Sequence, residues 1–168
     1  FRVAPFEIRQ AKQEAIIDME VLEETQEDKA PPEALSASFG TVSPRKILVA
    51  DDNELIIKIL QNILESENYL TLTAKDGLEA LRLALQEKPD LIITDLLMPK
   101  MDGLTLVKKL KSQLATRYIP IIMLTAKDEA DLELKGIDAG ADEYLTKPVN
   151  PKQLLAGLDR LINRANAA

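Results

Sequence analysis

The sequence contains no cysteine, no histidine and no tryptophan, and aromatic residues make up only 4% of its 168 residues. Without cysteine, the chain can form neither disulfide bonds nor thiolate metal sites. No apolar run approaches the roughly 18 residues that a membrane-spanning helix needs, and the chain does not open with a signal-peptide pattern. We therefore expect a cytoplasmic protein that does not enter a membrane.

A strongly basic segment is also missing. The net charge is −7; residues 1–44 carry four basic against nine acidic side chains, and residues 45–168 carry 17 against 19. Binding to the phosphate backbone of nucleic acid needs a cluster of basic residues, which neither segment offers. We therefore expect no direct contact with nucleic acid.

What the sequence does contain divides into two domains, residues 1–44 and residues 45–168. In the first, residues 7–27 are rich in Ala, Glu, Gln and Lys and predict a helix, while a proline pair and a Ser-rich stretch predict a linker. We interpret this part as an acidic helix plus linker from an upstream region. Because the chain starts at Phe1, we expect a larger multidomain protein, with an output or kinase domain upstream.

The second domain alternates between strand-like and helix-like segments. Short apolar runs predict strands at 46–50, 70–74, 90–94, 120–124 and 143–146. Helical patterns follow them at 53–66, 78–87, 104–115, 128–139 and 151–164. The first, third and fourth runs are apolar throughout, as strands buried on both faces are, whereas the second alternates and the fifth is short and polar. This pattern predicts an α/β flavodoxin-like, doubly wound parallel sheet of order 2-1-3-4-5 with five helices.

Polar side chains follow the strands that should form the site. Asp51 and Asp52 follow the first strand, Asp95 the third, Thr125 the fourth and Lys147 the fifth. In such a sheet, ligands bind at the carboxyl ends of strands where the strand order reverses. Carboxylates brought together repel one another unless a cation joins them, and oxygen ligands without His or Cys favour Mg²⁺. The three aspartates therefore predict a magnesium site.

Each of these residues also has an ordinary structural interpretation. Asp51, Asp52 or Asn53 can cap the helix that follows, and a lysine is usually solvated. One cap needs only one residue, however, so the adjacent pair of aspartates favours a function. Lys147 stands directly before Pro148, whose ring restricts the loop that aims the lysine.

Four segments together resemble the response-regulator receiver domain of two-component signalling. They are VADDN, ITDLLMPKMDG, IIMLTA and ADEYLTKP, and they occur in the order of that family. The resemblance covers about residues 45–164. It implies that Asp95 accepts a phosphoryl group from the phosphohistidine of a sensor histidine kinase or a histidine phosphotransfer protein.

The resemblance also implies how magnesium is bound. Asp52 and Asp95 would be direct ligands together with the backbone carbonyl of Leu97, and Asp51 would act mainly through water. Phosphorylation would then require Mg²⁺.

Three more residues receive roles from the resemblance. Lys147 would pair with the phosphoryl oxygens, Thr125 would hydrogen-bond them, and Tyr144 would be a rotamer switch coupled to Thr125. The bond between Lys147 and Pro148 would be cis. Phosphorylation would change the surface formed by the segments 128–139, 143–146 and 151–164.

The leading hypothesis is thus a signalling switch that catalyses only its own phosphorylation and dephosphorylation. A Mg²⁺-dependent phosphohydrolase with Asp95 as nucleophile is an alternative, but it needs an acid or base two residues on, where Leu97 stands. A binding module that is never phosphorylated is disfavoured, because all five functional positions are filled. Flavin binding would need a phosphate-binding loop after the first strand, and the sequence lacks one there.

Two further predictions concern a partner and a rate. Ile56 lies in the first turn of a helix with more apolar residues than one core-facing stripe needs. Core packing is its ordinary interpretation, and docking of the kinase or phosphotransfer protein is the one we favour.

Leu97 and Lys127 stand two residues after Asp95 and Thr125, where polar residues can position water. Because a leucine cannot, we predict slow loss of the phosphoryl group.

Overall fold

The computed structural model describes residues 42–128 and 139–167, in which five strands form one parallel sheet. The strands are β1 (Lys46–Ala50), β2 (Leu70–Ala74), β3 (Leu91–Asp95), β4 (Ile121–Thr125) and β5 (Glu143–Thr146). The helices of the described part are α3 (Glu54–Ser66), α4 (Gly77–Glu87), α5 (Gly103–Ser112) and α7 (Pro151–Ala167). The strand order β2-β1-β3-β4-β5 confirms the predicted flavodoxin-like sheet. The helices predicted at 7–27 and 128–139 lie wholly or mostly outside the described residues.

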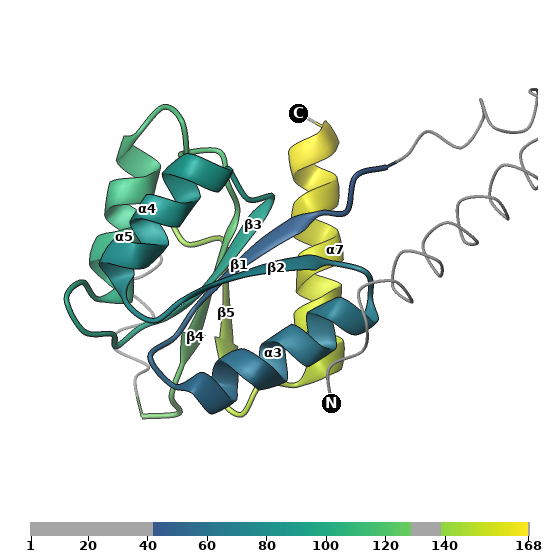
Figure 1. Ribbon diagram of the computed structural model, residues 1–168, viewed down its shortest axis with the longest axis horizontal. Coiled ribbons are helices and arrows are strands. Elements are labelled where there is room, and N and C mark those ends of the chain that lie inside the picture. Colours follow the sequence, from purple (N-terminus) through teal and green to yellow (C-terminus); the bar gives the residue numbers. More distant parts are fainter. Residues whose placement is uncertain (1–41, 129–138, 168) are drawn as a thin grey trace, which may run out of the picture. The chain divides into compact units, whose positions relative to one another are not determined.

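Helices cover both faces of this sheet (Figure 1). α3 and α7 lie on one side, and α4 and α5 lie on the other. Each pair closes its own apolar core: Ile47 and Val49 of β1 pack under α3 and α7, whereas Leu48 and Ala50 pack under α4 and α5. Because successive strand residues point to opposite faces, a strand buried on both sides must be apolar throughout. The predicted inner strands and edge strands are thereby confirmed.

β3 and β4 each begin and end one residue later than the sequence indicated. Asp90 stays outside β3 because both oxygens of its carboxylate are used. One accepts a hydrogen bond from the Arg45 guanidinium (3.1 Å), and the other accepts one from the backbone N–H of Lys46 (2.8 Å). Asp95 and Thr125 are the last residues of their strands rather than the first residues after them.

Polar side chains fix the starts of three helices. Asn53 precedes α3, Asp76 precedes α4 and Asp102 precedes α5, and each side chain accepts a hydrogen bond from a backbone N–H in the first turn of its helix. Such caps satisfy donors that have no partner within the helix. The loops after β1, β2 and β3 therefore turn sharply into their helices, which holds residues at the carboxyl edge of the sheet in place.

Two helix ends differ from the prediction. α5 ends early, at Ser112, because the Thr116 hydroxyl donates to the Leu110 carbonyl (2.7 Å) and closes the last turn. α7 continues to Ala167. In the ranges 42–128 and 139–167, no helix combines the length and the apolar character needed to cross a membrane.

Candidate functional site

Three carboxylates lie together at the carboxyl edge of the sheet. Asp51 and Asp52 directly follow β1, and Asp95 ends β3. The two strands are neighbours with Ala50 opposite Thr94, so their ends meet. One oxygen atom from each carboxylate lies within 4.8 Å of the others. The structure therefore brings together the three aspartates that the sequence singled out.

Asp51 and Asp52 occupy different environments although they are adjacent in the chain. Asp51 is fully buried, and Asp52 is exposed. The backbone N–H of Asp51 donates to the Ala74 carbonyl (3.1 Å), and its carboxylate accepts a hydrogen bond from the N–H of Asn53 (2.8 Å). Asp51 is thus fixed within the protein, while Asp52 borders the solvent.

Lys147 brings a positive charge into this cluster. Its backbone N–H donates to the Thr125 carbonyl (2.7 Å), which places the residue beside the end of β4. Its Nζ lies 3.0 Å from Asp51 Oδ2 and 2.9 Å from Asp95 Oδ1. The bond between Lys147 and Pro148 is cis, as the resemblance implied. One ammonium group therefore links the ends of β1, β3 and β5.

Burial and charge act against each other in this cluster. Burial raises the pKa of the Asp95 carboxyl; the Lys147 hydrogen bond lowers it and the Asp51 charge raises it, so that the pKa ends above its usual value. Burial lowers the pKa of Lys147, but its contacts with Asp95 and Asp51 outweigh that effect and leave the pKa raised. Lys147 therefore stays protonated and positively charged, whereas ionisation of the Asp95 carboxyl costs free energy.

The composition of the cluster fits a divalent cation. Three carboxylates face one ammonium group, so negative charge is in excess. All three side chains offer hard oxygen donors, which Mg²⁺ prefers to nitrogen or sulfur. Asp52 faces the solvent, from which an ion can enter.

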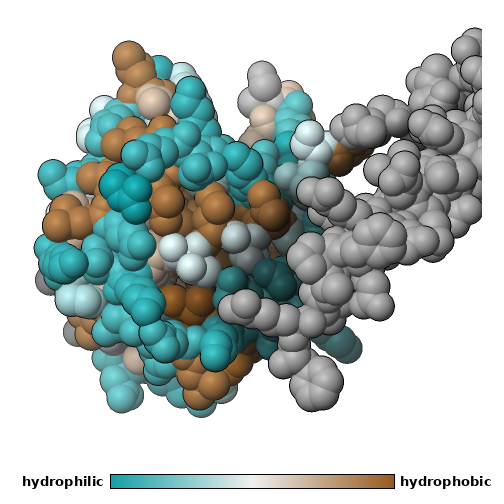
Figure 2. Space-filling view, viewed as in Figure 1, coloured by the Kyte–Doolittle hydropathy of each residue, from teal (hydrophilic) through white to brown (hydrophobic). Residues whose placement is uncertain are grey.

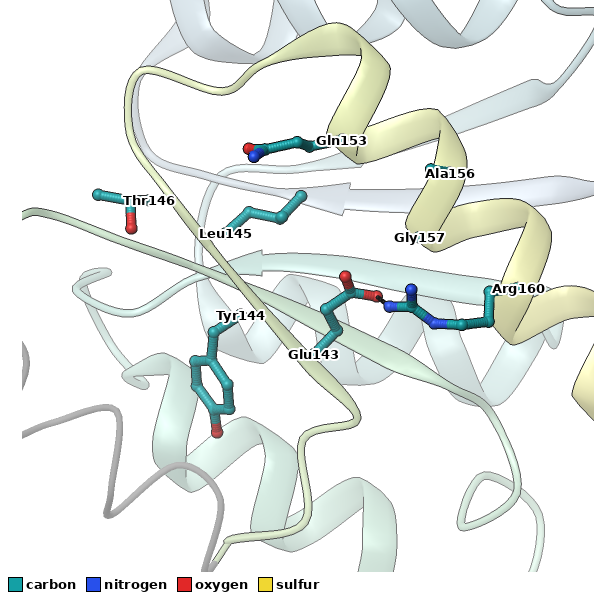
Figure 3. A pocket seen from close by; sticks show the side chains of 8 residues that line it. All are labelled: Glu143, Tyr144, Leu145, Thr146, Gln153, Ala156, Gly157 and Arg160. Carbon is teal, nitrogen blue, oxygen red and sulfur yellow. Dashed lines mark ion pairs between the residues drawn. The ribbon is translucent and has the colours of Figure 1, made fainter.

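Thr125 and Tyr144 lie on the strands beside the cluster. Thr125 is buried at the end of β4, one residue past the partner of Asp95 in the ladder. Tyr144 is half-buried in β5 and packs against the core under α4 and α5. Figure 3 shows its ring directed away from α7. Their coupled switch roles stay predictions.

Leu97, with a predicted role in dephosphorylation, and Ile56, with a predicted role in docking, differ in the exposure of their side chains. Leu97 is exposed, close in sequence to Asp95. Ile56 is half-buried and packs against the core under α3 and α7, whereas Leu55 and Ile59 on the same helix are exposed. The docking role of Ile56 therefore stays a prediction for a side chain that also supports the core.

Gly103 is a position that the sequence reasoning missed. Its N–H donates to the Leu96 carbonyl (2.8 Å), and a Cβ at this position would collide with the backbone carbonyl of Asp95. Only glycine lets the start of α5 approach the end of β3 so closely. The sequence signal was the pair Asp102-Gly103, which is typical of a turn but does not reveal the close contact.

A cavity lies elsewhere, between β5 and α7 (Figure 3). Its volume is about 430 Å³, and Glu143, Gln153, Gly157 and Arg160 are among its lining residues. An ion pair of 2.6 Å joins Glu143 to Arg160. Neither the three aspartates nor Lys147 line this cavity, so it is separate from the acidic cluster.

Comparison with known proteins agrees with the geometry. The response regulator receiver domain family matches residues 47–159. The alkaline phosphatase synthesis transcriptional regulatory protein PhoP of Bacillus subtilis is 45% identical over 124 residues, which cover 74% of this chain and 51% of that protein. The response regulator PleD of Caulobacter vibrioides is 41% identical over 111 residues, 66% of this chain and 24% of that protein. The chain thus spans about half, or less, of the length of these curated relatives.

Solved structures with moderate sequence identity share this fold. A putative response regulator from Chloroflexus aurantiacus has a TM-score of 0.70 and 33% identity, covering 72% of this chain and 99% of that one. The receiver domain of a sensor histidine kinase from Pseudomonas aeruginosa has a TM-score of 0.68 and 30% identity, with coverage of 72% and 99%, and holds a magnesium ion in its active-site cleft. This chain belongs to the response regulator receiver domain family of two-component signalling.

Proposed function

We propose that this receiver domain is a phosphoacceptor switch in which Asp95 accepts the phosphoryl group. The observation that carries the proposal is the double contact of Lys147 Nζ, 3.0 Å from Asp51 Oδ2 and 2.9 Å from Asp95 Oδ1. A lysine held by two buried carboxylates beside a third, exposed one is suited to receive an anion that carries its own oxygen atoms. An isolated structural ion pair would not need the third carboxylate.

The residues that would hold Mg²⁺ are Asp51, Asp52 and Asp95, with the carbonyl of Leu97 as a further proposed ligand. When bound, Mg²⁺ would neutralise negative charge on the phosphoryl group during transfer. The excess of carboxylates over ammonium groups in the cluster supports this assignment. The magnesium ion held by the Pseudomonas aeruginosa receiver supports it as well.

The reaction proposed for these residues is a phosphoryl transfer from histidine. A carboxylate oxygen of Asp95 attacks the phosphorus atom, the phosphorus–nitrogen bond breaks, and the imidazole leaves with the electron pair of that bond. Lys147 then pairs with the phosphoryl oxygens, and the Thr125 hydroxyl donates to one of them. These 168 residues contain no histidine, so the donor histidine lies outside them, and we propose that it belongs to a sensor histidine kinase or a histidine phosphotransfer protein.

The switch would begin with a change of partners at Lys147. The phosphoryl oxygens compete with Asp51 and Asp95 for its ammonium group, because each carries negative charge. Thr125 on β4 and Tyr144 on β5 would then move together and alter the surface formed by β5, α7 and the segment 128–139. We propose a cytoplasmic location, where these kinases transfer their phosphoryl groups.

The test of this function is phosphorylation of the pure chain. We expect incubation with acetyl phosphate and Mg²⁺ to add the mass of one phosphoryl group, and we expect a chelator such as EDTA to suppress the adduct. The measurement is intact-protein mass spectrometry. Absence of any adduct with Mg²⁺ present would contradict the proposal.

Ile56→Asp should slow transfer from the protein donor by at least about tenfold, equivalent to ~1.4 kcal/mol in the transition state. The change removes an apolar contact and adds a charge at the first turn of α3. Phosphorylation by acetyl phosphate should continue, because that donor needs no docking surface. The measurement compares both rates, with Leu114→Asp, at an exposed position in the turn after α5, as the matched control. An equal loss with both donors would show that Ile56 only supports the core.

Leu97→Asn should shorten the lifetime of the phosphorylated domain severalfold. The exposed Leu97 cannot hydrogen-bond water, whereas an amide side chain can hold the water that attacks the acyl phosphate. The measurement follows the decay of the adduct mass after the donor is removed. Leu114→Asn serves as the control, and an unchanged decay in Leu97→Asn would refute this explanation of slow dephosphorylation.

A further inference from the structure

The turn between β2 and α4 contacts both loops that carry the proposed magnesium ligands. Lys75 in this turn pairs with Glu54 at the start of α3, and Asp76 pairs with Lys100 in the loop after β3 (3.2 Å). The loop after β1 carries the two adjacent aspartates, and the loop after β3 carries the carbonyl proposed as a further ligand. In Figure 2, hydrophilic side chains predominate at the lower left of the domain, where the chain passes from β1 into α3 in Figure 1. Ion pairs thus connect three loops at the carboxyl edge of the sheet.

The two ion pairs differ in their exposure to solvent. The side chains of Lys75 and Glu54 are 64% and 68% exposed, and ion pairs of this kind contribute little to stability. The Asp76 side chain is only 11% exposed. One of its oxygens accepts a hydrogen bond from the N–H of Glu79 (2.8 Å), which caps α4, and the other pairs with Lys100. The pair of Asp76 and Lys100 is therefore the better fixed of the two.

Lys100 stands at a sharp turn of the backbone. Its φ is +66°, in the left-handed region, and the N–H of Met101 donates to the carbonyl of Pro99 (2.7 Å). A hydrogen bond between residues two apart, with a positive φ at the residue between them, is a γ-turn of the rare and strained type. A residue other than glycine keeps such a conformation only when the surrounding structure holds it. The ion pair with Asp76 is one of the contacts that hold it.

A backbone contact beside this ion pair joins the same two segments. A Cβ at Gly77, the first residue of α4, would lie 2.1 Å from the carbonyl oxygen of Met101. Only glycine allows the loop after β3 to come so close. The Met101 side chain is buried in the core under α4 and α5, which fixes the loop from its inner side. The start of α4 therefore holds the loop after β3 through backbone packing as well as through charge.

Leu97 lies between two fixed points of this loop. On one side, the N–H of Leu96 donates to Asp95 Oδ1 (2.9 Å), and the Leu96 carbonyl accepts from the N–H of Gly103 (2.8 Å). On the other side stands the turn at Lys100. The Leu97 side chain is exposed, so it does little to fix its own peptide group. The position of the Leu97 carbonyl therefore depends on the two ends of this short span.

We propose that Asp76 and Lys100 are positioning residues for magnesium, because their ion pair holds the loop after β3 with the Leu97 carbonyl beside the three aspartates. The inference rests on the proposed function, in which that carbonyl is a ligand. Groups that orient the ligands of a metal affect its affinity without contacting it. Mg²⁺ demands near-ideal octahedral geometry, so displacement of one ligand weakens its binding. The turn after β2 thus supports a site to which it contributes no ligand.

Lys100→Met separates this role from a simple effect of charge. Removing a positive charge from the loop that follows Asp95 should, by electrostatics alone, leave Mg²⁺ binding unchanged or make it tighter. Loss of positioning should instead weaken it. We expect the dissociation constant for Mg²⁺ to rise at least about fivefold, somewhat less than the roughly 10–100-fold typical of groups in direct contact with a metal ligand. The measurement is isothermal titration calorimetry of the whole chain with magnesium chloride.

Lys75→Met is the matched control. It removes the same charge from the turn after β2, but its pair with Glu54 is exposed at both ends. Mg²⁺ binding in this variant should be unchanged or slightly tighter, with circular dichroism confirming that both variants fold. Unchanged or tighter binding in Lys100→Met, or an equal weakening in Lys75→Met, would overturn the inference.

A double-mutant cycle tests whether Asp76 and Lys100 act as a unit. Asp76→Asn breaks the ion pair and still caps α4, because asparagine caps helices about as well as aspartate. The double variant Asp76→Asn/Lys100→Met should bind Mg²⁺ no more weakly than the single variant with the larger loss, whereas fully additive losses would contradict the inference.

The parent chain distinguishes failure of this inference from failure of the proposed function. If the parent binds Mg²⁺ and is phosphorylated while Lys100→Met binds Mg²⁺ equally well, only the positioning role is wrong. If the parent binds no Mg²⁺, the proposed function and this inference are both wrong.

Discussion

Replacing Asp95 with asparagine should abolish phosphorylation of the domain, with a loss of roughly a thousandfold or more in the rate of adduct formation. The amide is a far weaker nucleophile than the carboxylate, and its product would not be an acyl phosphate. Asp51 cannot substitute well, because it is buried with its oxygens bonded to Asn53 and Lys147. The measurement is the adduct mass after treatment with acetyl phosphate and Mg²⁺.

The same variant should remain folded, which separates loss of chemistry from loss of structure. The pKa of Asp95 is raised, mainly by burial, so the folded state binds this proton more tightly than the unfolded state does. The stability contributed by the protonated carboxyl is therefore lost as pH rises through its folded pKa, and the charged form is unfavourable at neutral pH. Asp95→Asn should thus melt at the same temperature as the parent or higher.

Asp102→Asn provides the matched control for this experiment. Asp102 is an exposed aspartate at the start of α5, outside the cluster, and asparagine caps helices about as well. This variant should keep the adduct. Survival of the adduct in Asp95→Asn, or its loss in Asp102→Asn, would contradict the assignment of the phosphoacceptor.

Gly103→Ala should destabilise the domain by at least about 3 kcal/mol, near the upper end for overpacked sites. The added methyl group would collide with the backbone carbonyl of Asp95 and approach the Cα of Leu96, and neither can yield without moving the end of β3. The displaced strand end carries the phosphoacceptor, so phosphorylation should also slow. Urea denaturation followed by circular dichroism measures the loss of stability.

Gly157→Ala is the matched control, because its Cβ would meet a side chain rather than backbone. The nearest atom is an oxygen of Glu143 at 2.7 Å, at the end of a flexible side chain that can shift. Alanine is also favoured over glycine inside a helix by about 1 kcal/mol, which offsets part of the clash. A loss of stability in Gly157→Ala as large as in Gly103→Ala would show that contact with backbone is not the cause.

The sheet could be predicted because the burial of a strand determines which of its residues are apolar. β3 and β4 are apolar runs that fill two cores at once, and the mixed sequence of β2 marks an edge. The start of β3 was misplaced by one residue, since the role of Asp90 depends on Arg45 and Lys46 far away in the chain. Tertiary contacts of this kind leave no local signal.

The site was predictable as a set of residues but not as a set of contacts. The rule that strand ends meet at one edge brings Asp51, Asp52 and Asp95 together without knowledge of any side chain. Which of the adjacent aspartates is buried, and how far Lys147 reaches, depends on side-chain directions that residue order does not encode. Which side chains of α3 are exposed depends on how the helix is rotated against the sheet, and this rotation is not encoded by residue order either. The half-buried state of Ile56 was therefore not predicted. The role assigned to residues 1–44 stays a prediction.

The position of β1 between β2 and β3 has a consequence for synthesis on the ribosome. β1 is made first, yet one of its long edges stays without a neighbour until residues 91–95 have emerged. A nascent chain that ends within α4 holds a two-stranded ribbon with an open apolar flank, which two strands alone cannot stabilise. Slow translation or a premature stop in that interval would expose the chain to aggregation or degradation, whereas release of β3 allows the sheet to close around its oldest strand.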